Sequence, residues 1–204
     1  MRKYIVVFAI LAMLPVIASA SVIYCTDFEA DDGGWVATSD WDPVGDWEWG
    51  EYRIDDYAGA YNPPPAAYSG TKMWGTVLHG DYTNAGGYSW LSQNFDFTGL
   101  VDIELEFASW AEVFYSFDTA KLFVNGDVLY ERDTSDAPTD WELFTIDMGA
   151  YDGMASVDIT FELYATTVVE RAGWYVDDIC ITGVPGPASL ALLGLASLAR
   201  RRRR

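Results

Sequence analysis

Two short runs near opposite ends of the chain each combine a cysteine with closely spaced acids. They span residues 24–29 and residues 173–183, and both alternate with the period of a β-strand. Two cysteines in a chain that carries an export signal favour a disulfide. Neighbouring carboxylates supply the hard oxygen ligands that bind cations such as Ca²⁺. We therefore expect the two runs to pair as strands, Cys25 to bridge Cys180 and the acids to share a cation.

The second run contains two adjacent acids inside a strand, which needs a physical reason. Its alternation puts Asp177 on the same face as Ile179 and Asp178 on the opposite face. If Ile179 points into the core, Asp177 shares that inward face, where an unpaired carboxylate is costly. A cation would compensate for this cost. The alternative is that Asp177 accepts hydrogen bonds from backbone amides or pairs with Arg171.

A third acidic pattern raises the question of catalysis. Asp102, Glu104 and Glu106 lie on one face of a predicted strand, where positions two apart are separated by about 6.6 Å. Inverting glycoside hydrolases need about 6.5–9.5 Å between their carboxyls, so the spacing permits such a pair. A solvated outer face explains the same alternation, and we predict that the protein is not an enzyme. The single histidine, His79, excludes a His-Glu-x-x-His zinc site.

Short strands separated by turns fill the span between residues 21 and 183. Asn125-Gly126 between two apolar runs is a strong hairpin signal, and no stretch here has convincing helical periodicity. We read residues 30–61 as mostly loop, with one strand-like piece at 46–52. This pattern predicts an all-β, antiparallel β-sandwich. The other predicted strands cover residues 67–76, 88–97, 101–112, 120–124, 127–131, 141–148 and 157–164.

Both ends of the chain differ from this central domain. Residues 1–20 are typical of a secretory signal peptide with its own apolar helix, and cleavage between Ala20 and Ser21 is expected. Residues 184–204 form a tail with a proline-rich break, a short apolar helix and terminal arginines. The apolar run of residues 189–199 is shorter than the 17–25 residues of a typical bilayer span. The arginines would hold this end on the cytoplasmic side of the membrane.

The central domain is strongly acidic. Residues 21–183 contain five Lys and Arg against all 31 Asp and Glu of the chain, a net charge of −26. Such a field repels nucleic acid and anionic lipid. It suits an exported domain in a medium that contains cations, and we predict no nucleic-acid partner.

The tail resembles the PEP-CTERM sorting signal of bacteria that carry an exosortase. Its Pro-x-Pro motif has Gly186 where the family usually has Glu. The resemblance implies export, transient inner-membrane anchoring, cleavage by an exosortase-type membrane protease, and delivery to the cell surface or extracellular matrix. The sorting residues that it implies are Val184, Pro185, Gly186, Pro187, Arg200, Arg201, Arg202, Arg203 and Arg204.

The central domain resembles the MAM-like, choice-of-anchor J β-sandwich, an accessory domain of secreted bacterial proteins that include immune inhibitor A metalloproteases. The resemblance implies a jelly-roll used for binding or scaffolding, with a structural Ca²⁺ where the first and last strands meet. Carried over by motif, Glu29 and Asp177 are the leading ligands, followed by Asp27 and Asp178. The motifs lie at residues 27–29, 46–50, 67–76, 78–82, 144–151 and 173–179.

Nine Trp and 13 Tyr are many for a chain of 204 residues, and amphipathic rings can stack on sugars as well as fill cores. Trp35, Trp41, Tyr57 and Tyr61 lie in loop-like sequence and are the candidates for ligand contact. We therefore predict an exported, non-catalytic binding or structural module. The alternatives are a carbohydrate-binding module for extracellular polysaccharide and a glycoside hydrolase.

Overall fold

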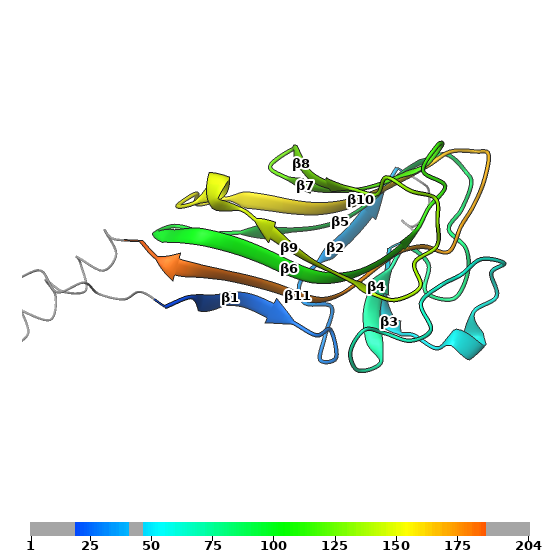
Figure 1. Cartoon of the computed structure of the whole chain (residues 1–204), viewed down its shortest axis with the longest axis horizontal. Helices are drawn as coiled ribbons and strands as arrows, with labels where there is room; N and C mark the ends of the chain where they lie inside the picture. Colours follow the sequence, from blue (N-terminus) through cyan, green and yellow to red (C-terminus); the bar gives the residue numbers. More distant parts are fainter. Residues whose placement is uncertain (1–18, 41–46, 187–204) are drawn as a thin grey trace, which may run out of the picture.

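The computed structural model describes residues 19–40 and 47–186, which form two antiparallel β-sheets packed face to face (Figure 1). This confirms the predicted all-β sandwich. In chain order the elements are β1 (Ser21–Thr26), β2 (Val36–Ser39), β3 (Glu48–Glu51), the 3₁₀-helix η1 (Ile54–Asp56), β4 (Lys72–Gly75), β5 (Gly87–Phe95), β6 (Leu100–Glu112), β7 (Thr119–Val124), β8 (Asp127–Glu131), β9 (Glu142–Asp147), the 3₁₀-helix η2 (Gly149–Tyr151), β10 (Val157–Ala165) and β11 (Gly173–Pro185).

The six-stranded sheet has the order β3-β4-β11-β6-β9, and β1 also pairs with β11. The five-stranded sheet has the order β2-β5-β10-β7-β8. Figure 1 shows the five-stranded sheet above the six-stranded one, with β1 and β11 side by side along the lower edge. The first and last described strands therefore meet, as the sequence predicted.

The main core fills the space between the two sheets. On β10, alternate residues from Val157 to Leu163 are fully buried, and the residues between them face outward. A second, smaller cluster lies on the other side of the six-stranded sheet, under the loops that precede and follow β4. Its buried members are Tyr52, Met73, Leu78, Trp110, Ala172 and Tyr175. The six-stranded sheet is thus covered on both faces near β4.

Most strand predictions are confirmed, with two differences in the first half of the chain. The segment 67–76 forms a strand only at Lys72–Gly75, so the residues before it belong to a long loop. Conversely, β2 falls within residues 30–61, where the sequence suggested mostly loop. The predicted Asn125-Gly126 hairpin joins β7 to β8, with both residues at positive φ.

β11 extends past the predicted domain boundary at residue 183, into the first residues assigned to the tail. Val184 and Pro185 continue β11 and pair with Val101 and Leu100 of β6. The next residue, Gly186, donates its backbone N–H to the Gly99 carbonyl oxygen at 2.8 Å.

The expected signal helix and apolar tail helix lie outside the described residues, as do Pro187 and the arginines from Arg200 to Arg204. In the part of the chain that the structure describes, no helix is long and apolar enough to cross a membrane.

Candidate binding groove

The predicted disulfide is present and joins β1 to β11. Cys25 pairs directly with Cys180, and Thr26 pairs with Ile179 in the same antiparallel ladder. Among the described strands β1 pairs only with β11, so the disulfide fixes an edge strand to the strand beside it. In the chain-entropy model, a link across 155 residues stabilises the fold by roughly 4–5 kcal/mol.

A β-bulge in β11 changes which face its side chains occupy. The pairing of β11 with β6 slips between Asp177 and Cys180, and Asp178 has a φ of 47°. Before the bulge, Val176 points into the main core; after it, Ile179 does. The prediction that Asp177 shares the inward face of Ile179 is therefore wrong, because the bulge breaks the period of two.

Asp177 is instead buried on the outer side of the sheet, under the loop before β4. It is 0% exposed, and its carboxylate accepts backbone N–H groups of Ser69 at 3.1 Å and Asp178 at 2.8 Å. Burial raises the pKa of Asp177 to about 7, although these two N–H groups favour its ionised form. The three ion pairs among the described residues leave Asp177 without a cationic partner. Of the two alternatives to a cation, the structure shows hydrogen bonds from backbone amides to Asp177 and no ion pair with Arg171.

Two other predicted calcium ligands, Glu29 and Asp178, contact the same part of the chain as Asp177. The Glu29 carboxylate accepts the N–H groups of Lys72 at 2.6 Å and Thr71 at 2.8 Å, which hold its pKa below the usual value. Asp178 accepts the Ser69 hydroxyl at 2.7 Å. Asp27, the residue after β1, accepts the N–H of Glu29 at 3.2 Å. Within residues 19–40 and 47–186, no three acidic, His or Cys side chains gather into a group that could hold a metal ion alone.

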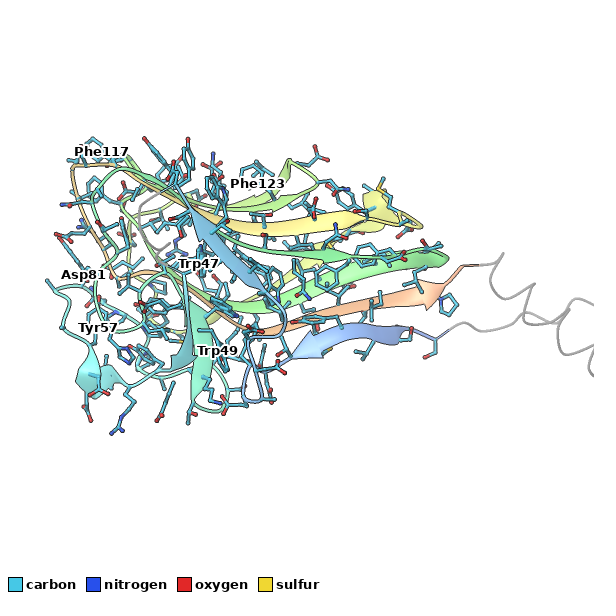
Figure 2. All side chains as sticks on the ribbon, turned by 180° about the vertical axis from the view of Figure 1, so that it is seen from behind. Trp47, Trp49, Tyr57, Asp81, Phe117 and Phe123 are labelled. Carbon is cyan, nitrogen blue, oxygen red and sulfur yellow. A yellow bond between two sulfur atoms is a disulfide. The ribbon has the colours of Figure 1, made fainter. Side chains whose placement is uncertain are left out.

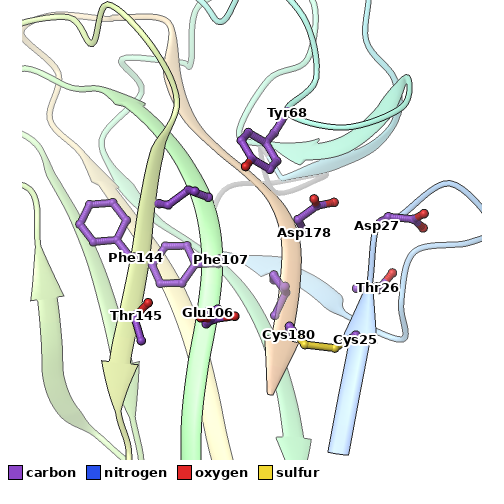
Figure 3. A pocket seen from close by; sticks show the side chains of 12 residues that line it. Cys25, Thr26, Asp27, Tyr68, Glu106, Phe107, Phe144, Thr145, Asp178 and Cys180 are labelled. Atoms are coloured by element: carbon purple, nitrogen blue, oxygen red, sulfur yellow. A yellow bond between two sulfur atoms is a disulfide. The ribbon is translucent and has the colours of Figure 1, made fainter. Parts of the chain in front are cut away.

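A groove of about 670 Å³ lies beside the disulfide on the outer face of the six-stranded sheet (Figure 3). Its floor follows one cross-strand row, in which Thr145 pairs with Glu106, Glu106 with Cys180, and Cys180 with Cys25. Its volume is in the range of ligand sites in proteins. The residues that line it are Cys25, Thr26, Asp27, Tyr68, Glu106, Phe107, Leu143, Phe144, Thr145, Asp178, Ile179 and Cys180.

The groove combines acids with exposed apolar side chains. Leu143 is 67% exposed and Tyr68 is 40% exposed, although both are large apolar groups. Trp141 holds Tyr68 in an edge-to-face contact at 6.0 Å between ring centroids, and donates its indole N–H to the Ala66 carbonyl oxygen at 3.1 Å. Tyr68 thus projects from a supported loop. The sequence analysis identified neither Tyr68 nor Leu143 as a site residue. Leu143 could have been found, because a leucine stands at a strand position whose alternation faces solvent.

Three of the four aromatic side chains proposed for ligand contact lie among the described residues and make other contacts. Trp35 is 2% exposed and packs in the core, so its predicted role at a surface is wrong. Tyr57 donates its hydroxyl to Asp81, and Figure 2 shows this pair at the loop end of the sandwich. The Arg171 guanidinium lies 4.3 Å from the Tyr61 ring centroid. Trp41 lies outside the described residues.

The three acids considered for catalysis stand on the outer face of β6 and are exposed. Asp102 sits at positive φ, and its N–H donates to Asp152 at 3.1 Å. Glu106 is the member of this set that lines the groove. The sheet thus presents an acidic, solvent-exposed face along β6.

No family model matches the chain. Bacillopeptidase F of Bacillus subtilis (strain 168) is 29% identical over 163 residues, which cover 78% of this chain and 10% of that protein. The chain therefore spans about a tenth of the length of the curated relative that it matches.

Among solved structures, a carbohydrate-binding module from the β-sandwich superfamily aligns with a TM-score of 0.48 and 12% identity, covering 76% of this chain and 60% of that one. The K3 cleaved adhesin domain of Lys-gingipain from Porphyromonas gingivalis aligns with a TM-score of 0.45 and 14% identity, covering 80% and 99%.

Proposed function

We propose that this protein is an exported, non-catalytic binding module, and that the groove beside the disulfide is its ligand site. The observation that carries this proposal is the exposure of Tyr68 and Leu143 over a concave, acid-lined surface. Large apolar side chains exposed together with convergent polar groups are typical of binding sites.

The chemistry of the groove favours a hydroxyl-rich, uncharged ligand. The carboxylates of Asp27, Glu106 and Asp178 can each accept hydrogen bonds from hydroxyl groups. The Tyr68 ring offers a flat amphipathic surface to the C–H face of a sugar. The net charge of −26 over residues 21–183 repels acidic polymers. We therefore propose neutral extracellular polysaccharide as the ligand class.

Export and surface delivery form the second part of the proposal. The disulfide supports it, because such bonds persist mainly in oxidising compartments. The PEP-CTERM-like tail adds transient anchoring and cleavage by an exosortase-type protease. Because β11 holds Val184 and Pro185 in the sheet, we expect cleavage after Gly186. Intact mass of the mature protein from its native bacterium should show loss of residues 1–20 and of the tail from about residue 187. A C-terminus still ending at Arg204 would contradict cleavage.

We also propose that calcium stabilises the junction between β1, β11 and the loop before β4. Asp177 fits this role because it is a buried carboxyl with amide partners and no paired cation. Glu29 contacts the same loop, two residues further along. Calcium would supply positive charge beside Asp177, and backbone carbonyls would have to complete its coordination.

Affinity electrophoresis and calorimetry with cellohexaose, xylohexaose and mannohexaose test the groove. We expect at least one probe to bind, and Tyr68→Ala to weaken its binding to the groove at least tenfold, about 1.4 kcal/mol. Tyr115→Ala is the matched control, since Tyr115 is 43% exposed at the loop end. Groove binding unchanged by Tyr68→Ala would contradict the assignment of the site. Release of reducing sugar from a bound probe would contradict the absence of catalysis.

A further inference from the structure

The outer face of the five-stranded sheet carries a second side-chain cluster, far from the groove. Tyr88 and Trp90 alternate outward along β5, and their rings stack at 5.7 Å with only 5° between their planes. Tyr164 of β10 packs on the other side of Tyr88 at 4.6 Å. These rings lie on the sheet surface and not in the core, and Tyr88 is 39% exposed.

Next to these rings lies a hollow of about 320 Å³, which we call the Trp90 hollow. Strand register explains its shape. One cross-strand row runs from Ser92 through Thr160 to Phe123, so two small side chains lie between larger neighbours. Trp90 lies in the adjacent cross-strand row and lines the edge of the hollow. Tyr88 lies on the side of Trp90 that faces away from Ser92. The lining residues are Thr38, Trp90, Ser92, Phe123, Gly126, Thr160 and Glu162.

The second ring wall comes from the β7–β8 hairpin. Phe123 is half-buried on the outer side of β7, and Figure 2 shows it on the opposite sheet from Trp49. Gly126, the second turn residue, has open space around the position of a Cβ atom. The hollow is therefore open at the hairpin end.

The polar groups of the Trp90 hollow are oriented by a hydrogen bond and a neighbouring ion pair. Glu162 accepts the Trp90 indole N–H at 2.8 Å through one carboxylate oxygen, which fixes the ring relative to the sheet. In the same cross-strand row, Lys121 pairs with Glu131 at 3.3 Å. An anionic ligand would meet the Glu162 carboxylate, and Lys121 is already paired, whereas a neutral ligand meets ring faces and hydroxyls.

We propose that the Trp90 hollow is a second saccharide site that takes one pyranose unit of a neutral polysaccharide. The face of Trp90 away from Tyr88 stacks on the C–H face of the sugar, and Phe123 closes the other side. The hydroxyls of Ser92 and Thr160 and the carboxylate of Glu162 hydrogen-bond the sugar hydroxyls. The site does not depend on the groove, which lies on the other sheet.

Two saccharide sites on opposite sheets have a functional consequence. One molecule can bind two polysaccharide chains, or two segments of one chain, and so gain avidity or act as a cross-link. This would suit a structural role in an extracellular matrix. Cross-linking requires both sites, whereas binding of a short oligosaccharide requires one.

The test isolates the Trp90 hollow by working in the Tyr68→Ala background of the full protein. We expect at least one of cellohexaose, xylohexaose and mannohexaose to bind this variant. Adding Thr160→Phe fills the hollow without removing a core contact and should weaken that binding at least tenfold. Trp90→Ala should do the same. Val22→Phe is the matched control, because it adds a ring at a position 66% exposed on the other sheet.

Two results would overturn the second site: no hexasaccharide binds the Tyr68→Ala protein, or its binding is unchanged by Thr160→Phe and Trp90→Ala. Thermal melts of each variant show that the fold is retained. The same measurements show separately whether the groove is a binding site. If it is not, the wild type and Tyr68→Ala should bind the hexasaccharide with equal affinity.

Discussion

The outer faces of the two sheets are built on equivalent cross-strand rows, yet they differ in regularity and charge. The floor of the groove follows Thr145, Glu106, Cys180 and Cys25. The wall of the Trp90 hollow follows Thr38, Trp90, Glu162 and Lys121. The first row contains a disulfide next to a bulge and is bordered by unpaired acids. The second is an uninterrupted ladder in which Glu162 accepts the Trp90 indole N–H and Lys121 pairs with Glu131. Ligand binding in the groove should therefore depend on how β1 is held at the edge of its sheet, whereas ligand binding in the Trp90 hollow should not.

Removal of the disulfide should give the largest effect. Cys25→Ser with Cys180→Ser should lower the free energy of unfolding by about 2–5 kcal/mol, because β1 loses its covalent link. Urea unfolding followed by fluorescence measures this loss. Binding in the groove should fall at least tenfold, while binding in the Trp90 hollow should stay within about threefold. Equal losses at both sites would show that the two faces are not independent.

The second effect concerns Asp177. Its folded-state pKa of about 7 lies above the ordinary aspartate value of 3.8, so between these values the folded state binds more protons than the unfolded state. Metal-free stability should therefore fall as the pH rises from 4 to 7, by up to about 4 kcal/mol. Urea unfolding in EDTA at pH 5 and pH 8 measures the change.

Two variants and calcium sharpen this test. Asp177→Asn should remove the pH-dependent loss, whereas Asp178→Asn, a matched change at the next residue, should keep it. Calcium should raise the melting temperature more at pH 8, where Asp177 is ionised, than at pH 5. Identical melting curves with and without calcium at pH 8 would contradict calcium binding.

The third effect tests the ring stack behind the hollow. Tyr88→Ala removes the ring on which Trp90 packs, and such aromatic pairs contribute about 0.5–1.5 kcal/mol. Calorimetry in the Tyr68→Ala background should show saccharide binding about 3–10-fold weaker. Tyr115→Ala should leave it unchanged. A Tyr88→Ala protein that binds as tightly as its parent would mean that Trp90 does not need this support.

The smallest effect belongs to the ion pair on the same row. Lys121→Met breaks the pair with Glu131, whose side chains are 26% and 39% exposed. Partly exposed pairs contribute little, so the free energy of unfolding should change by less than about 1 kcal/mol. Neutral saccharide binding should change less than twofold. A larger loss of affinity would show that Lys121 contacts the ligand.

The regular parts of the fold followed from the sequence because they depend on local patterns. The alternation of β10, the Asn125-Gly126 turn and the pairing of the cysteine-bearing strands all involve side-chain period or turn chemistry. These strands and this turn can be located in the sequence without knowledge of their tertiary contacts. Trp90, Ser92, Phe123, Thr160 and Glu162 of the Trp90 hollow also lie on strands that the sequence predicted, whereas Thr38 lies on β2, which it did not predict. The ring stacking across β5 and β10 could be seen only from the strand register.

The candidate sites were less predictable, because a single residue changed their geometry. The bulge at Asp178 moves Asp177 to the other face, and no pattern in the run signals an aspartate at positive φ. Tyr68 is brought over the groove by a loop whose path depends on contacts with Trp141. Trp35 lies in loop-like sequence yet completes the core. Such tertiary contacts override local propensity.

A titration of ¹⁵N-labelled protein with the tightest-binding hexasaccharide tests most directly whether the two faces bind independently. The Trp90 indole N–H, which hydrogen-bonds Glu162, reports on the hollow, and the backbone N–H of Asp178 reports on the groove. We expect both signals to shift, and Thr160→Phe to abolish the Trp90 shift while leaving that of Asp178. Shifts confined to the loop end, around Tyr57 and Tyr61, would contradict the account of both sites.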